Sequence, residues 1–198
     1  LDPAGRRFWF VPYDQLSGDL GALAQEPARE LGIVLVESPA KAARRPYHKQ
    51  KLALVLANLR HFALEQGKRG VAVRHVVSSG GYAEALAKVA ADLGAPVSVM
   101  RPAERELRHE LASLVAAGRL VETPHEGWLT EPEDFTASQG PRPPWRMDAF
   151  YRYVRHKTGI LMDSRKRPLG GKMSFDADNR KAWKGEPPAP SLPSFRSD

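Results

Sequence analysis

The pattern of apolar and polar residues along the chain predicts short strands that are separated by helices. Five apolar runs lack helical spacing and are bounded by turn residues, which is typical of strands. The run at residues 31–36, Leu-Gly-Ile-Val-Leu-Val, is continuously apolar, as in a strand that is buried on both faces. In order, the predicted strands cover residues 7–11, 31–36, 71–77, 97–100 and 120–121.

A long helix is predicted within residues 44–70. Pro46 suits the first turn of a helix, and Gly67 suits its end. Apolar residues recur at helical spacing between them, and Leu54 and Leu64 widen the apolar face beyond a narrow stripe. We therefore expect this helix to lie against a sheet.

Other segments between the predicted strands carry the same helical spacing. Further helices are expected at residues 81–93, 104–117, 132–139 and 147–157. Strands that alternate with helices imply parallel pairing with right-handed crossovers. The sequence thus predicts an α/β fold, a Rossmann-like doubly wound sheet of five parallel strands with helices on both faces.

The composition bounds the chemistry of this fold. The chain has 198 residues, of which 42% are hydrophobic, and it has no cysteine, so it holds no disulfide and no cysteine-bound metal or iron-sulfur cluster. None of the six histidines pairs with another at ligand spacing on one helix face, so we expect no metal site. No apolar run reaches membrane-spanning length and no signal-peptide pattern is present, so we expect a cytoplasmic protein without a membrane partner.

Positive charge gathers in the last quarter of the chain. The segment from Arg155 onward contains ten Lys or Arg residues and five Asp or Glu residues, which accounts for most of the net charge of +7. Such a segment is either a solvated tail or a surface that faces phosphates. Both interpretations stay open at this point.

The composition changes at a proline-rich connector, residues 140–145. We expect an α/β domain over residues 1–140 and an extension over residues 141–198 that contains a helix, a basic loop and a proline-rich tail. Residues 161–179 carry too few apolar side chains to pack alone, so we expect a long loop. Its glycines at 170 and 171 predict a mobile backbone. The candidate phosphate contacts in this loop are Arg165, Lys166, Arg167 and Lys172.

In doubly wound folds, ligands bind outside the carboxyl ends of the strands. This rule points to residues 13–16, to Glu37 with Ser38, and to residues 101–104. The loop after the first strand lacks the glycine fingerprint of a dinucleotide site, which argues against a nicotinamide enzyme. Asp14 and Glu37 are candidates for an acid–base pair, but loop carboxylates more often cap helices or face solvent, so we assign no catalytic residue.

Four separated motifs, in this order, carry a resemblance to a known family. They are Asp14-Gln15-Leu16, residues 46–51 with residues 60–63, the helix 147–159 followed by Leu161-Met162, and residues 170–180, Gly-Gly-Lys-Met-Ser-Phe-Asp-Ala-Asp-Asn-Arg. Together they resemble the N-terminal half of the deoxyribodipyrimidine photolyase-related proteins, the bacterial iron-sulfur cryptochromes and (6-4) photolyases.

The resemblance implies an N-terminal antenna domain, joined by a linker to a helical half that holds FAD, a four-iron (4Fe-4S) cluster and the DNA lesion. The parent activity is that of a DNA photolyase, a carbon–carbon lyase that repairs damaged DNA with light. Because the flavin and cluster sites belong to the other half, we expect this chain to be non-catalytic alone and to work with a FAD-binding helical half. The alternative is a stand-alone module that binds nucleic acid or a protein partner without photochemistry.

The resemblance also implies a site for an antenna chromophore, 6,7-dimethyl-8-ribityllumazine, at the carboxyl edge of the sheet. The candidate residues for this site are Tyr13, Asp14, Gln15, Leu16, Glu37, Ser38 and Glu104. Three residues depart from the family pattern: Tyr13 replaces a glycine, Arg101 an acidic residue and Arg105 an aromatic residue. Because a tyrosine ring fills the space that a glycine leaves open, we expect no uptake of the chromophore or only weak uptake.

Overall fold

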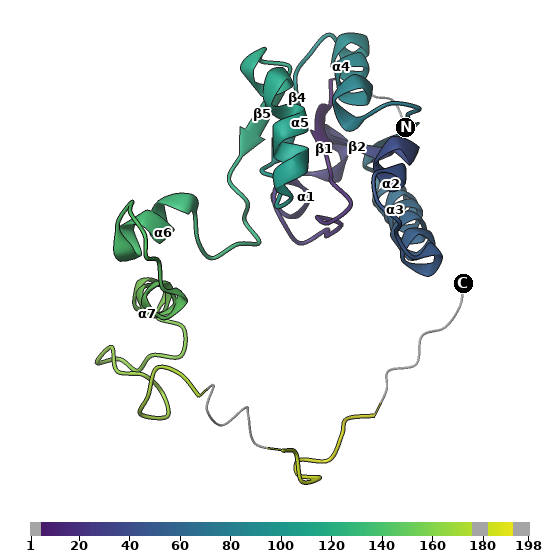
Figure 1. Ribbon diagram of the computed structural model, residues 1–198. Helices are drawn as coiled ribbons and strands as arrows, with labels where there is room; N and C mark the ends of the chain where they lie inside the picture. Colours follow the sequence, from purple (N-terminus) through teal and green to yellow (C-terminus); the bar gives the residue numbers. More distant parts are fainter. Residues whose placement is uncertain (1–4, 176–181, 192–198) are drawn as a thin grey trace. The chain divides into compact units, whose positions relative to one another are not determined.

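A five-stranded parallel sheet forms the centre of the first part of the chain (Figure 1). Its strands are β1 (Arg7–Phe10), β2 (Leu31–Glu37), β3 (Ala72–Val77), β4 (Val97–Met100) and β5 (Leu120–Thr123). They lie in the order β3-β2-β1-β4-β5, and every neighbouring pair is parallel. This order places β1 in the middle and confirms the predicted doubly wound α/β fold.

The computed structural model describes residues 5–175 and 182–191, and the chain divides into two units between Trp128 and Leu129. The division precedes the boundary that we expected after residue 140. The helix α6 (Pro132–Gln139) packs against α7 (Met147–Thr158), so it belongs to the second unit.

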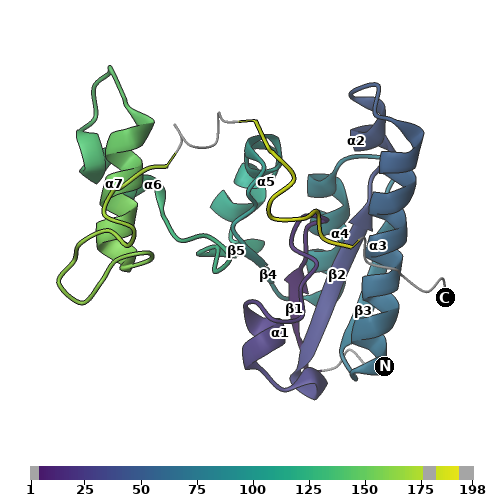
Figure 2. The same ribbon diagram turned by 90° about the horizontal axis from the view of Figure 1, so that it is seen from below.

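Helices cover both faces of the sheet (Figure 2). They are α1 (Ala22–Gln25), α2 (Pro39–Ala43), α3 (Lys49–Lys68), α4 (Tyr82–Leu93) and α5 (Arg105–Ala116). Successive side chains of β2 lie on opposite faces of the sheet. Val34 packs with the side chains of α4 and α5, whereas Ile33 packs with those of α1 and α3. All seven residues of β2 are buried, as its continuous apolar run predicts.

Close packing inside the sheet explains the glycine within β2. The ring of Phe8 on β1 lies over Gly32, where an added Cβ atom would come within 2.4 Å of the ring. A larger residue at this position would clash with the Phe8 ring and force it to move. Gly32 therefore allows the aromatic residue of β1 to be buried.

The long helix α3 begins later than we predicted and buries a narrower face. It starts at Lys49 rather than in the turn of Pro46, because the Nδ1 atom of His48 accepts a hydrogen bond from the backbone N–H of Gln50 at 3.3 Å and caps the helix. Leu54 and Leu64 are 61% and 64% exposed, so they do not widen the buried face as expected. Only one side of α3 meets the sheet, through Leu59, Phe62 and Gln66.

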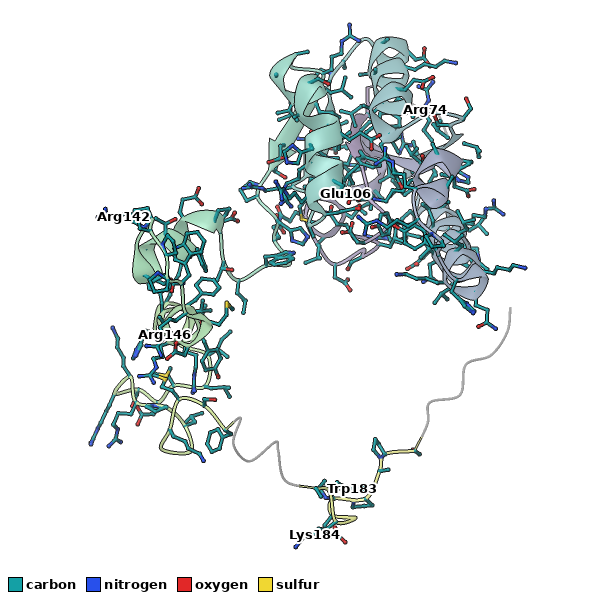
Figure 3. All side chains as sticks on the ribbon, in the orientation of Figure 1. Arg74, Glu106, Arg142, Arg146, Trp183 and Lys184 are labelled. Carbon is teal, nitrogen blue, oxygen red and sulfur yellow. The ribbon has the colours of Figure 1, made fainter. Side chains whose placement is uncertain are left out.

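The second unit is organised by an aromatic contact and a buried carboxylate between α6 and α7. The rings of Phe135 and Phe150 are 5.4 Å apart. Asp134 accepts hydrogen bonds from the Nζ atom of Lys157 at 2.6 Å and from the hydroxyl group of Tyr153 at 3.2 Å. Arg142 and Arg146 extend from the connector between the two helices (Figure 3).

Candidate functional site

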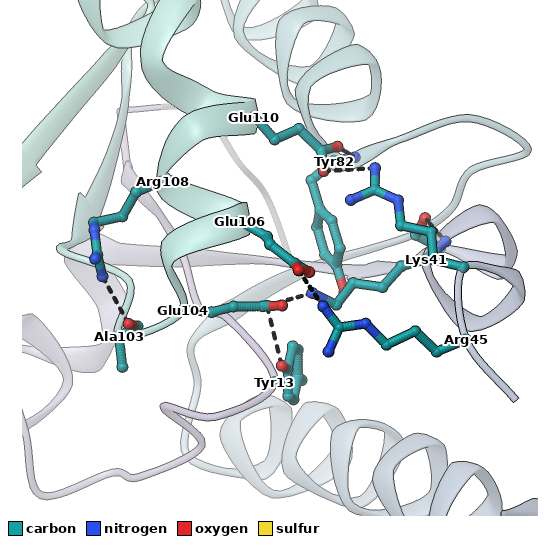
Figure 4. A network of polar contacts seen from close by, with 11 residues as sticks. Tyr13, Lys41, Arg45, Tyr82, Ala103, Glu104, Glu106, Arg108 and Glu110 are labelled. Atoms are coloured by element: carbon teal, nitrogen blue, oxygen red, sulfur yellow. Dashed lines mark hydrogen bonds and ion pairs between the residues drawn. The ribbon is translucent and has the colours of Figure 1, made fainter. Parts of the chain in front are cut away.

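The carboxyl edge of the sheet is occupied by a network of polar side chains around Glu104 (Figure 4). Glu104 lies at the N-terminus of α5 and accepts a hydrogen bond from the hydroxyl group of Tyr13 at 3.1 Å. Its carboxylate also accepts a short hydrogen bond from the Nζ atom of Lys41 on α2. The same ammonium group lies 5.5 Å from the centre of the Tyr13 ring, within the range of a cation–π contact. Three segments are thus tied together across the edge.

The charges in this network shift the acidities of its members. Burial raises the pKa of the Tyr13 hydroxyl group, and the nearby negative charge of Glu104 raises it further. Burial alone would raise the pKa of Glu104, but the hydrogen bond and the positive charge of Lys41 outweigh it and lower that pKa. Tyr13 is therefore a neutral donor and Glu104 an ionised acceptor at neutral pH.

A second carboxylate of α5 continues the network toward α4. Glu110 accepts a hydrogen bond from the Nη2 atom of Arg44 at 3.1 Å and bonds to the backbone N–H groups of Tyr82 and Ala83 at the start of α4. Burial raises the pKa of Tyr82 to about 12. The N-terminus of α4 therefore already has an internal anion.

Glu37 at the end of β2 is bound by side chains of α3 and β3. Its two carboxylate oxygens accept hydrogen bonds from the Nε and Nη2 atoms of Arg60 at 2.7 and 2.8 Å. The Nε2 atom of His75 lies 2.9 Å from one of these oxygens. Hydrogen bonding from Arg60 lowers the pKa of Glu37. Glu37 therefore ties β2 to α3 and β3, and its acceptors are already used.

Gln15 and Ser38 also have structural partners at this edge. The Nε2 atom of Gln15 donates to the backbone oxygens of Met100 and Arg101, both at 3.1 Å, and fixes the loop after β1 to the end of β4. The Oγ atom of Ser38 caps α2 by accepting from the backbone N–H of Lys41 at 3.2 Å, and it donates to the oxygen of Gly80 at 3.0 Å.

An open pocket lies beside this edge, between the loop after β1 and α3. It has a volume of about 410 Å³, which lies in the size range of small-molecule sites. Although Asp14 is exposed, its surroundings displace enough water to raise the pKa of its carboxyl group. The lining residues are Tyr13, Asp14, Leu16, Asn58, His61, Phe62 and Glu65.

Most of the residues expected to hold an antenna ring therefore do not converge on one ligand space. Tyr13, Glu37 and Glu104 use their polar atoms on one another or on nearby cations. Only Tyr13, Asp14 and Leu16 of the expected set line the pocket beside the edge. The carboxylates of Glu37 and Glu104 already have cationic partners within the chain.

The basic segment of the second unit is a loop over the described residues 161–175, as expected, and its first part folds back as a hairpin, whereas residues 176–179 of the expected loop lie outside the described part of the chain. Met162 and Pro168 form an antiparallel bridge, and the backbone N–H of Leu169 donates to the oxygen of Leu161 at 2.9 Å. At the tip, the Oδ1 atom of Asp163 accepts from the backbone N–H groups of Arg165 and Arg167 at 2.9 and 2.8 Å. The turn is thus held by one carboxylate, whose pKa is lowered by these backbone hydrogen bonds, that of Arg167 first.

The four expected phosphate contacts differ in their surroundings. Arg165 and Lys166 are exposed at the tip of the hairpin, whereas Arg167 donates through its Nε atom to Asp163 at 2.9 Å. The Nζ atom of Lys172 lies 4.5 Å from the centre of the Phe175 ring. The tip therefore presents Arg165 and Lys166 most openly.

Sequence patterns did not indicate several residues that matter at the edge. Lys41, Arg60 and His75 pair with the expected carboxylates; Arg60 lies in the motif at residues 60–63, but no sequence pattern predicts these three contacts. Asn58 and Glu65 lie two turns apart on α3, so helical spacing could have placed them on one face with Phe62.

Neither a metal site nor a membrane span is found within the described part of the chain. No three His, Asp or Glu residues in residues 5–175 and 182–191 gather as metal ligands. In the same residues, no helix combines the length and the apolar character needed to cross a bilayer.

Comparisons with known proteins agree with this architecture. Residues 9–198 match the family described as deoxyribodipyrimidine photo-lyase-related protein. The chain belongs to this family. It is 31% identical over 193 residues to a (6-4) photolyase from Agrobacterium fabrum (strain C58 / ATCC 33970). The match includes 93% of this chain but only 38% of that photolyase, so this photolyase-related chain corresponds to a part of its relative.

Proposed function

We propose that the chain is the N-terminal domain of a photolyase-like flavoprotein that repairs DNA with light, and that it does not repair DNA by itself. The observation that carries this proposal is the match to 38% of a (6-4) photolyase, together with a Rossmann-like domain over the matched residues. Such a role implies a location in the cytoplasm and damaged DNA as the substrate of the full-length protein. It also implies a FAD-binding helical half as the partner of this domain.

The cofactors of the reaction are expected in that partner half. Photorepair uses a reduced flavin whose chemistry the protein only positions and tunes. With no cysteine in the sequence, this chain offers no thiolate for a 4Fe-4S cluster. The domain would contribute stability and DNA contacts, and FAD and the cluster would be bound elsewhere.

The domain's own edge supports a structural role more than light harvesting. The Tyr13, Lys41 and Glu104 side chains use the polar groups that would otherwise face a chromophore. We therefore propose that the chain takes up 6,7-dimethyl-8-ribityllumazine weakly or not at all.

A repair assay tests the main proposal. The chain is illuminated with an oligonucleotide that contains a single (6-4) lesion, in the presence of reduced FAD, and the remaining lesion is measured. We expect no light-dependent loss of the lesion, and the A. fabrum photolyase serves as the active control. Repair by the 198-residue chain alone would overturn the proposal.

A second candidate function is favoured by the basic hairpin. Arg165 and Lys166 are exposed on a turn that Asp163 holds in place, which is an arrangement that suits contact with phosphates. A stand-alone module would use this hairpin on nucleic acid without any photochemistry. Salt-dependent DNA binding by the chain, without a flavin half, would support this function.

A further inference from the structure

A basic groove runs along the outer face of α5, beside the edge strand β5. Its volume is about 540 Å³. The groove differs from the pocket near Tyr13 in every lining residue. These lining residues are Arg101, Arg105, Arg108, His109, Ala112, Val115, Ala116 and Glu122.

Helical spacing brings the basic residues of α5 to one side. Arg108 and His109 lie three and four residues after Arg105, away from the buried face that Leu107 and Leu111 form. Figure 4 shows Arg108 on the side of α5 away from the network of Glu106 and Glu110. The helix therefore separates an acidic face, which is paired with α2, from a basic face.

The positive charge in this groove is only partly balanced. Glu122 on β5 forms an ion pair with the Nε atom of Arg101 at 3.7 Å. Arg108 uses its Nη1 atom to donate to the backbone oxygens of Pro102 and Ala103 at 2.8 and 2.6 Å. The side chains of Arg105 and His109 form no hydrogen bond or ion pair with any other residue that the structure describes. A guanidinium and an imidazole thus face the groove with their donors available.

The floor beyond these donors is small and apolar. Ala112 and Ala116 are exposed and lie one turn apart, next to the half-buried Val115. Small side chains let the carbon atoms of a ligand approach the helix closely. The groove therefore combines cationic donors at one end with an apolar surface at the other.

We propose that this groove binds a phosphate-bearing ligand, with a terminal phosphate at Arg105 and His109 and a nucleoside over Ala112 and Ala116. The phosphate comes from a free nucleotide or from the 5′ end of a nucleic-acid strand. This site shares no lining residue with the pocket near Tyr13 and goes beyond the proposed role of the domain.

Phosphate suits the groove better than a carboxylate does. A terminal phosphate carries about −1.5 to −2 charge at pH 7, whereas a carboxylate carries one charge. One phosphate can therefore balance both Arg105 and the second cationic group in the groove, Arg108. Its three oxygens also match the forked donors of guanidinium groups.

The experiment follows the side-chain signals of the full chain by NMR. Inorganic pyrophosphate, thymidine 5′-monophosphate and a thymidine hexanucleotide with a 5′-phosphate are each titrated in. We expect the Arg105 Nε–H and His109 imidazole signals to shift and to reach saturation. R105Q should bind about tenfold more weakly, because it lacks one charged hydrogen-bonding group. Equal affinity for monophosphate and hexanucleotide assigns the site to free nucleotides, and tighter binding of the hexanucleotide assigns it to strand ends.

Matched variants distinguish binding in the groove from non-specific attraction to the net positive charge of the protein. A112E places a carboxylate in the floor and should abolish binding of inorganic pyrophosphate, whereas A112Q has nearly the size of A112E without its charge and should retain that binding. R29Q removes an arginine whose side chain is 85% exposed outside the groove and should leave affinity unchanged. The proposal fails if the Arg105 and His109 signals do not saturate, if R29Q weakens binding as much as R105Q, or if oligoglutamate binds as tightly as the phosphates.

Discussion

Two of the three carboxylates expected at the carboxyl edge, Glu37 and Glu104, each bind a cation of the chain. Glu104 is held by Lys41 and Glu37 by Arg60. Charged hydrogen bonds of this kind are stronger than neutral ones, and they fix the side chains that make them. Asp14 differs from both, because desolvation by the surrounding atoms raises its pKa and it lines a pocket.

Replacement of Glu37 by glutamine should destabilise the protein. Glu37→Gln places an amide N–H₂ donor next to the donors of Arg60 and His75 and weakens both contacts. We therefore expect the free energy of unfolding, measured with urea at pH 7, to fall by about 1–3 kcal/mol. The pKa of Glu37 is lowered in the folded protein, so this contribution is present above the unfolded pKa and is lost as the pH falls through the folded pKa. The exposed Glu133→Gln variant is the control, and an equal loss in both variants would contradict this role.

Tyr13 should control access to the carboxyl edge. Tyr13→Gly removes the ring and frees Glu104 from one hydrogen bond, so we expect greater uptake of 6,7-dimethyl-8-ribityllumazine, measured by absorption after gel filtration. Tyr13→Phe keeps the ring without the hydroxyl group and should still exclude the chromophore. Stoichiometric uptake by the unmodified chain that is lost in Tyr13→Gly would show that the ring instead stacks on the ligand.

At the scale of elements, the same helix or hairpin often separates two kinds of contact. One face of α5 holds Glu106 and Glu110 against Arg45 and Arg44, and another face lines the basic groove. In the second unit, the hairpin uses Asp163 to fold its backbone and leaves Arg165 and Lys166 at the tip. The Asp163 carboxylate thus holds the turn at residues 163–167, which precedes Gly170 and Gly171.

The hairpin should contribute to nucleic-acid binding through its tip. Arg165→Gln and Lys166→Gln should each lower the slope of log affinity against log salt by about one unit, because each removes a phosphate contact. Arg167→Gln should have a smaller effect, because that guanidinium already pairs with Asp163. Fluorescence anisotropy with a labelled duplex measures the slopes, and an unchanged slope in the Arg165→Gln, Lys166→Gln double variant would identify a solvated linker.

At the scale of the whole molecule, the sequence predicted the periodic elements well and the contacts between them poorly. All five strands were expected, and α6 was predicted to the residue because Pro132 and Gly140 mark its ends. The helices α1 and α2 were not predicted, since four or five residues are too short to show a period. The parallel-strand rule placed Tyr13 and Glu104 at one edge, where they do meet.

The partners of those residues could not be predicted for a physical reason. Whether Arg60 or another cation reaches Glu37 depends on side-chain rotamers and on distances across the fold, which leave no local pattern. For the same reason, the sequence placed Arg101 directly after β4 at the carboxyl edge but did not indicate that Arg101 and Arg105 line a groove beside β5. Helical spacing indicates which face a residue shares, but not what that face meets.

The whole chain should lose stability in acid because most of its shifted carboxylates have lowered pKa values. These groups are Glu37, Glu104, Asp134 and Asp163. Each stabilises the fold above its unfolded pKa, and its contribution disappears as the pH falls through its lower folded pKa. We therefore expect the urea midpoint, followed by circular dichroism, to fall progressively as the pH is lowered from about 5 toward 2.

Asp14 provides an internal check on that sign. Its folded pKa is raised, so its ionised form opposes folding at neutral pH and its protonation relieves this cost as the pH falls. Asp14→Asn should therefore raise the urea midpoint at pH 7. It should also steepen the loss of stability in acid, because the variant lacks the Asp14 protonation that favours folding as the pH falls. A midpoint of the unmodified chain that stays constant or rises between pH 5 and pH 2 would contradict the assignment of these ion pairs as stabilising.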